Sequence, residues 1–174
     1  KSPNPPPPTP RTTAAESLRP VAHTRDRGID DAAAGTFDFY LLNISWSPEF
    51  CASHPGNVQC AARPGFVVHG LWPQNNDGTF PENCGGMAKP PNSAAYLDIM
   101  PTTELILHEW KTHGTCSGLN PDGYFGRVRA AFRSVAIPSM FAAARTPPAT
   151  IKPGDLVLEF SRANPSFPAD SFAV

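Results

Sequence analysis

The chain has 174 residues and a formal net charge of −1, a length that fits one domain with a substantial core. The near-neutral charge excludes a protein that grips polyanions through its overall field, so any contact with nucleic acid must come from a local cleft. The sequence opens on Lys1 rather than Met, as expected for a mature form or a fragment, and no apolar run reaches transmembrane length, so no membrane contact is predicted.

The N-terminal segment is dominated by proline. Its first ten residues read KSPNPPPPTP, and large apolar side chains are almost absent, so the segment cannot bury enough surface to fold. We predict an extended, polyproline-like disordered tail over residues 1–35 and a folded domain over residues 36–174. A plain tether is favoured over a recognition motif.

Two segments rich in aromatic and branched residues follow the tail. Phe37–Trp46 (FDFYLLNISW) is apolar on both alternation faces, which predicts a buried central strand. It contains the glycosylation sequon at Asn43, although a strand interior is a poor acceptor site. Phe66–Trp72 (FVVHGLW) is predicted as a second strand with His69 at its centre. A long excursion rich in Asn, Gly and Pro runs from residue 73 to residue 91.

Two helices are expected after this excursion. The first covers Pro101–Gly114 (PTTELILHEWKTHG), where Pro101 and two threonines mark the start and Gly114 marks the end. The second covers Pro121–Val135, with Asp122 as its cap. A last strand is predicted over Asp155–Phe160 (DLVLEF). Strands separated from a block of helices indicate an α+β fold.

The stretch HEWKTH, within the first predicted helix, is similar to the zinc-protease signature HExxH but is one residue longer. In HExxH the two histidines are four residues apart and converge on one ion. Here His108 and His113 are five residues apart and diverge by about 140° on a helix. They are therefore too far apart to share a tetrahedral zinc easily, and no metal is expected.

The same stretch fits proton transfer better than metal binding. Glu109 and His113 are four residues apart, so the carboxylate is expected to orient and charge the imidazole. His108 and Thr112 fill the adjoining sector of the helix. Two proton carriers and a carboxylate on one face are what general acid–base catalysis requires. The alternative is a solvated polar helix end.

A third histidine, His69, lies in the second predicted strand. On a regular strand it projects beside Val67 and Leu71, where the alternative to a functional histidine is a satisfied core histidine. Gly70 lets the chain turn or be approached closely, and Trp72 offers an aromatic ring to a stacking substrate. These two neighbours favour a catalytic His69.

At this point the sequence resembles a known family. The segments FVVHGLWP (66–73) and HEWKTHGTC (108–116) are similar to the two active-site segments of the ribonuclease T2 family, the secreted endoribonucleases that include the plant S-ribonucleases. FDFYLLNISWSPEFC (37–51) resembles the opening strand of that family, and the similarity extends to about Asn164. The resemblance implies an antiparallel sheet packed against several helices. It also implies cleavage of single-stranded RNA without a metal, a cofactor or an obligatory protein partner.

The resemblance implies a role for each matching residue. His69 corresponds to the general acid on the leaving 5′-oxygen, and His113 to the general base that takes the proton of the ribose 2′-hydroxyl. Glu109 matches an acidic residue that assists at the phosphate, and His108 matches a phosphate-binding histidine. Attack by the 2′-oxygen gives a 2′,3′-cyclic phosphate and then a 3′-phosphate. The need for that hydroxyl explains a preference for RNA over DNA.

A base-binding site is also implied by the family pattern. Trp72 matches a stacking aromatic residue, and Phe80 lies where a second aromatic ring commonly completes the sandwich. Gln74 occupies a position that is often Asp or Asn, and its amide can both donate and accept hydrogen bonds. For Phe80, a loop anchor that packs on the core is an equal alternative.

The cysteines Cys51, Cys60, Cys84 and Cys116 form an even set that allows three pairings. Their spacing favours disulfides in an oxidising compartment over a structural zinc site, so a secreted or periplasmic location is expected. The family pattern implies the pairs Cys51–Cys60 and Cys84–Cys116. The second pair would tie the excursion to the end of the first helix.

Two features depart from the family pattern. Members commonly carry Lys immediately before the last histidine, whereas this chain has Thr112 there and Lys111 one residue earlier. We therefore expect a slower enzyme or another cation, with Arg63 as a candidate by proximity in sequence; a catalytically weak or inactive RNA-binding or signalling protein is the alternative. The family also continues with a further strand and more cysteines, whereas this sequence stops at Val174. A shortened domain or a differently closed sheet is expected.

Overall fold

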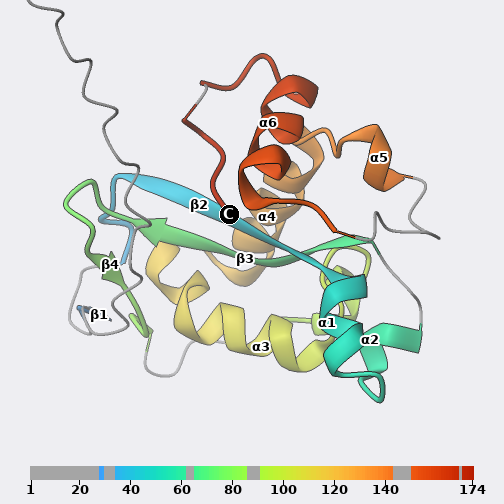
Figure 1. The fold of residues 1–174 in the computed structure, drawn as a ribbon. Coiled ribbons are helices and arrows are strands. Elements are labelled where there is room, and N and C mark those ends of the chain that lie inside the picture. Colours follow the sequence, from blue (N-terminus) through green and yellow to red (C-terminus); the bar gives the residue numbers. More distant parts are fainter. Residues whose placement is uncertain (1–27, 30–33, 62–64, 86–90, 143–149, 169) are drawn as a thin grey trace, which may run out of the picture.

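We describe a computed structural model of the chain, in which two paired strands have helices on both sides (Figure 1). The fold is α+β, as predicted, with an antiparallel sheet and several helices. None of the helices described is both long and apolar enough to cross a membrane. The structure describes residues 28–29, 34–61, 65–85, 91–142, 150–168 and 170–174.

The strands β2 (Phe39–Trp46) and β3 (Phe66–Gln74) form the antiparallel pair at the centre of the molecule, in register from Phe39 opposite Gln74 to Trp46 opposite Phe66. Two shorter strands, β1 (Gly28–Ile29) and β4 (Phe80–Pro81), pair in parallel. β1 lies within the range predicted as a tail. Most of the tail, residues 1–27 and 30–33, is outside the described residues.

β2 is a strand, as predicted, but the prediction that it is a buried central strand is wrong. Within the described residues the sheet containing β2 has two strands, and no residue of β2 is fully buried. Tyr40 and Leu42 pack against the core, whereas Phe39 and Leu41 are 45% and 38% exposed. Apolar residues on both alternation faces therefore do not imply burial of both faces here.

The register of the two long strands shifts once, at His69. Asn43 pairs with Gly70 and the next residue, Ile44, pairs with Val68, which leaves His69 as an extra residue in β3. A β-bulge of this kind bends the strand and redirects a side chain. His69 therefore does not follow the regular alternation predicted from the sequence.

The two predicted helices are present. α3 (Thr103–Thr112) begins after Thr102, whose hydroxyl accepts a hydrogen bond from the backbone N–H of Leu105 at 3.2 Å. α4 (Pro121–Ser134) is capped by Asn120, not by Asp122 as predicted. Asn120 directly precedes the first helical residue, and its side chain accepts a hydrogen bond from the N–H of Gly123 at 2.8 Å, which is the usual capping geometry.

The predicted last strand, Asp155–Phe160, is wrong, because these residues lie in a helix, α6 (Pro153–Ala163). Pro153 stands at the start of the helix, where its fixed φ is favourable, and Asp155 lies in the first turn. A short apolar run cannot distinguish a strand from a helix by periodicity alone. Phe160 of this helix packs on Phe66 of β3 with ring centroids 5.4 Å apart.

The main core lies between the β2–β3 pair, α3 and α4. The remaining elements are the helices α1 (Ser47–Ser53), α2 (Val58–Ala61) and α5 (Ser139–Ala142) and the 3₁₀ turns η1 (Ser93–Tyr96) and η2 (Gly114–Ser117). Buried apolar residues from strands, turns and helices meet in this core: Val68, Leu71, Tyr96, Ile99, Met100, Ile106, Trp110, Tyr124, Phe125 and Val128.

Candidate active site

Glu109 is a carboxylate buried at the junction of α3 and β3. It is 1% exposed, and its Oε2 accepts a hydrogen bond from Nε1 of Trp72 at 2.8 Å. Its Oε1 lies 3.7 Å from Nε2 of His69 and has no hydrogen-bond partner among the residues described. Burial raises the pKa of the Glu109 carboxyl to about 7, and the Trp72 hydrogen bond partly opposes that rise.

Gly70 allows β3 to approach this carboxylate. A Cβ atom at Gly70 would overlap with Oε2 of Glu109 and with Nε1 of Trp72. Any side chain at this position would therefore displace the hydrogen bond between them. The close approach expected at Gly70 is thus present, and the group that lies against it is the Glu109 carboxylate, a catalytic candidate.

His113 lies directly after α3 and is 6% exposed. Its imidazole stacks on Trp72, with ring centroids 5.0 Å apart and planes at 28°. Burial, together with the charges of His108 and His69, lowers the pKa of His113 to about 4. The ring is therefore neutral over most of the acidic range and can accept a proton there.

His69 also contacts Trp72, and its side chain is 44% exposed. Its ring meets Trp72 edge-on at a centroid distance of 5.9 Å. Burial lowers the pKa of His69 below its ordinary value, and the charge of His108 lowers it further. The exposed His108 thus lies within electrostatic reach of both other histidines.

Of the four residues predicted for catalysis and phosphate binding, His69, Glu109 and His113 contact Trp72, and His108 lies within electrostatic reach of the other two histidines. In the described part of the chain, no group of three His, Cys, Asp or Glu side chains is arranged to hold a metal ion. Two imidazoles, those of His69 and His113, and the Glu109 carboxyl, whose pKa is raised, can take and give protons at one substrate.

The expected pairing of Glu109 with His113 is wrong. No hydrogen bond or ion pair joins these two side chains in the described structure, and Nδ1 of His113 is buried without a partner there. His113 caps the helix with φ −116° and ψ −41°, so the spacing of a regular helix does not apply to it. Trp72 lies between the two instead, bonded to one and stacked on the other.

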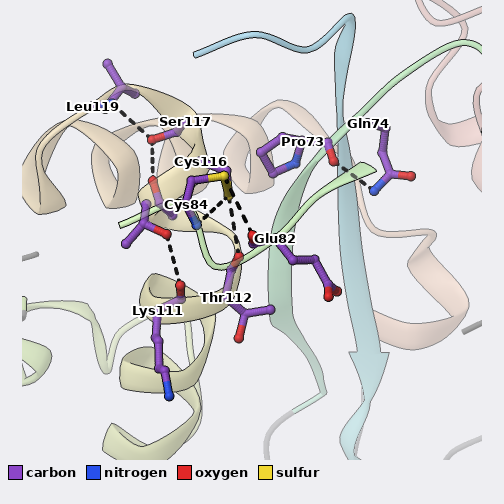
Figure 2. Close-up of a disulfide and its surroundings, with 11 residues drawn as sticks. Pro73, Gln74, Glu82, Cys84, Lys111, Thr112, Cys116, Ser117 and Leu119 are labelled. Atoms are coloured by element: carbon purple, nitrogen blue, oxygen red, sulfur yellow. Dashed lines mark hydrogen bonds between the residues drawn. A yellow bond between two sulfur atoms is a disulfide. The ribbon is translucent and has the colours of Figure 1, made fainter. Parts of the chain in front are cut away.

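Thr112 and Lys111 occupy different positions at the end of α3. Thr112 is half-buried, and its carbonyl accepts a hydrogen bond from the N–H of Asn83 at 2.8 Å. Lys111 is exposed, and its side chain points away from the neighbouring disulfide (Figure 2). Arg63 is outside the described residues.

Two disulfides, Cys51–Cys60 and Cys84–Cys116, are present in the pairing that the resemblance implies. The second joins the segment after β4 to η2, beside His113 (Figure 2). The N–H of Cys116 also donates to the carbonyl of His113 at 3.0 Å. This bridge therefore fixes the end of α3 where the histidine is presented.

Gln74 is the last residue of β3, and Phe80 is the first residue of β4. The Nε2 of Gln74 donates to the carbonyl of Pro73 at 2.9 Å, which leaves the amide oxygen and the second N–H of Nε2 for a ligand. Phe80 is half-buried, whereas the adjacent Pro81 is fully buried. Pro81 rather than Phe80 therefore anchors this segment to the core.

Comparison with known proteins agrees with this geometry. A model of the ribonuclease T2 family matches residues 37–154. "Ribonuclease" from Aeromonas hydrophila is 45% identical over 89 residues, which cover 50% of this chain and 41% of that protein. "Probable ribonuclease" from Haemophilus influenzae is 32% identical over 134 residues, covering 66% and 49%. The chain spans about half the length of the curated relatives it matches.

Solved structures share the fold. An RNase-related protein from Calystegia sepium has a TM-score of 0.59 at 25% identity, covering 74% of this chain and 76% of that chain. RNase NT in complex with 5′-AMP has a TM-score of 0.60 at 20% identity, covering 74% and 73%. The family match includes every histidine and carboxylate of the site and extends over more than half of the sequence. The chain belongs to the ribonuclease T2 family.

Proposed function

We propose that this chain is an endoribonuclease that cleaves single-stranded RNA by transesterification at the ribose 2′-hydroxyl. One observation carries the proposal: imidazoles from two separate elements, His69 of β3 and His113 after α3, contact the same Trp72 ring. Both have lowered pKa values, and the buried Glu109 lies beside them. Paired proton carriers around one ring suit a reaction that needs a base and an acid together.

In the first step His113 acts as the base. Because its Nδ1 is buried, its Nε2 takes the proton of the ribose 2′-hydroxyl. The 2′-oxygen forms a bond to the adjacent phosphorus, and the bond from phosphorus to the 5′-oxygen breaks. His69, the more exposed imidazole, gives its proton to the departing 5′-oxygen. The products are a 2′,3′-cyclic phosphate and a free 5′-hydroxyl.

In the second step the proton transfers reverse. Neutral His69 takes a proton from water, the water oxygen attacks phosphorus, and protonated His113 returns a proton to the 2′-oxygen. The product is a 3′-phosphate. Glu109, protonated below its raised pKa of about 7, donates a hydrogen bond to a phosphate oxygen, and His108 adds positive charge there.

The base of the substrate is held at Trp72, Gln74 and Phe80 in this proposal. Stacking of a base on an aromatic ring contributes about 1–3 kcal/mol. One face of Trp72 already contacts His113, so the base uses its other face or the ring of Phe80. The Gln74 amide offers both an acceptor, its oxygen, and a donor, its second N–H, to the edge of the base.

Cleavage of a dinucleotide tests the proposal directly. We expect release of a 2′,3′-cyclic phosphate that persists in excess EDTA, and no cleavage of the 2′-deoxy substrate. His69→Ala and His113→Ala should each lower kcat by about 100-fold or more. His54→Ala is the matched control, because His54 stacks on Phe50 at the end of α1 and lies outside the site. Loss of turnover with a chelator would contradict the mechanism.

A second function is favoured by one observation. The half-buried Thr112 stands where the family commonly has a cation, and the exposed Lys111 side chain points away from the Cys84–Cys116 disulfide. A catalytically weak or inactive RNA-binding or signalling protein would bind the uncleavable substrate but release no cyclic product. The two disulfides support a secreted or periplasmic location for either function.

A further inference from the structure

The sheet face that carries the proposed base site continues onto β2. Leu41 pairs directly with Trp72, and Phe39 pairs directly with Gln74. Residues opposite each other on antiparallel strands project from the same face of the sheet. Phe39 and Leu41 therefore stand beside the two β3 residues proposed to hold the base.

These two side chains are open to solvent. Phe39 is 45% exposed and Leu41 38% exposed, whereas their neighbours Tyr40 and Leu42 pack on the core from the opposite face. A large aromatic side chain and a leucine are thus exposed next to a proposed binding site. Exposed apolar groups that adjoin a site commonly extend it.

Phe80 completes a row across this end of the sheet. The turn after β3 is closed by two hydrogen bonds from Asn75 to Thr79, backbone to backbone and side chain to side chain, each 2.9 Å long. The turn returns the chain so that β4 contacts β3, and β2, β3 and β4 gather at one end of the molecule (Figure 1). Gln74 thus pairs with Phe39 on one side and precedes the turn that leads to Phe80.

The charges of this region suit a base rather than a phosphate. Residues 39–46 and 66–81 contain no Lys or Arg. The nearest carboxylate along the chain, Asp38, accepts a hydrogen bond from the N–H of Asn76 at 2.7 Å. A phosphate would meet negative charge here, whereas the uncharged face of a base can stack on aromatic and apolar side chains.

We propose that Phe39 and Leu41 form a stacking site for one further base of the RNA substrate, adjacent to the base held at Gln74. The inference rests on the proposed ribonuclease function and extends it from a dinucleotide to at least three nucleotides. Continuity of the sheet face from Trp72 and Gln74 onto β2 makes RNA the occupant. A protein partner or a second copy of the chain is an outcome that the test can report.

The test compares substrates of increasing length. For Phe39→Ala and Leu41→Ala, we expect kcat/KM on a dinucleotide to stay within about 2-fold of the wild type. On a trinucleotide extended at one end, 5′ or 3′, kcat/KM should fall by about 10-fold, the loss expected for one stacked base. Phe39→Tyr should retain activity on the longer substrate. Val58→Ala, at another exposed apolar residue on α2, is the control.

Binding of uncleavable RNA separates this proposal from the proposed function. A 2′-O-methyl trinucleotide with 2-aminopurine at its extended end should bind wild-type protein with quenched fluorescence and bind Phe39→Ala about 10-fold more weakly. Absence of cleavage by the wild type would overturn only the proposed function. Equal losses on dinucleotide and trinucleotide, no loss on either, or a change in sedimentation from dimer to monomer in Phe39→Ala would overturn the stacking site.

Discussion

At the scale of single residues, Trp72 connects Glu109 and His113. Its Nε1 donates to Glu109 at 2.8 Å, and its ring stacks on His113 at 5.0 Å. Trp72→Phe would keep an aromatic ring but remove the N–H donor. We expect the pKa of Glu109 to rise further, because the hydrogen bond that lowers it is lost, and kcat/KM to fall by about 10-fold. A pH–rate profile and carboxylate NMR would check both; an unchanged Glu109 pKa would contradict the positioning role.

The histidines predict a bell-shaped pH dependence with an acidic optimum. His113 must be neutral to act as base, so kcat/KM should rise as pH passes about 4. His69 must be protonated to act as acid, so kcat/KM should fall through a pKa below the ordinary 6.5. His108→Ala should move both limbs to higher pH, because the charge of His108 lowers both pKa values. A profile that is flat from pH 4 to 7 would contradict paired acid–base catalysis.

At the scale of elements, the end of α3 sets the electrostatics of the site. Thr112→Lys would place a cation in the last turn of α3, where the helix dipole also favours positive charge. We expect kcat/KM on RNA to rise by about 10-fold, because the cation would stabilise negative charge on the phosphorane. Lys111→Thr should have little effect, since Lys111 is exposed and points away. An unchanged or reduced rate for Thr112→Lys would count against this account.

Elements with strong local signals were predictable from the sequence. The threonine cap and the glycine stop located α3, and the two histidine segments indicated a candidate site on β3 and α3. Contacts between distant residues were not predictable: the Trp72–Glu109 hydrogen bond joins positions 37 residues apart. The bulge at His69 leaves no mark in an alternating pattern. α6 was missed because six apolar-rich residues fit a strand and a helix equally well.

At the scale of the whole molecule, the core holds the site elements together. The hydroxyl of the buried Tyr124 on α4 donates to the carbonyl of Leu71 at 2.9 Å, directly before Trp72. The Cys84–Cys116 disulfide fixes the segment that follows His113. The two halves of the site are therefore attached to one packed core. This rigidity explains how Glu109 can remain buried without an ionic partner that fully neutralises it.

Burial of Glu109 makes the stability of the whole fold depend on pH. The pKa of its carboxyl is about 7 in the fold against an ordinary 4.5, so the unfolded chain releases the proton first and stability is lost as pH rises from 4.5 to 7. Glu109→Gln keeps an acceptor for Trp72 and cannot ionise. We expect this variant to match the wild type at pH 4 but to exceed it by up to about 3 kcal/mol at pH 8, while losing activity.

Urea unfolding at the two pH values measures that difference. His113 contributes the opposite trend, because its lowered pKa adds stability as pH rises from about 4 to 6.5, but it is present in both proteins and cancels in the comparison. Glu104→Gln, at an exposed carboxylate in the first turn of α3, should instead lose a little stability at pH 8. If Glu109→Gln were no more stable than the wild type at pH 8, burial of the ionised carboxylate would not destabilise the fold. The raised pKa of Glu109 would then be contradicted, and with it the proposed hydrogen bond from protonated Glu109 to the phosphate.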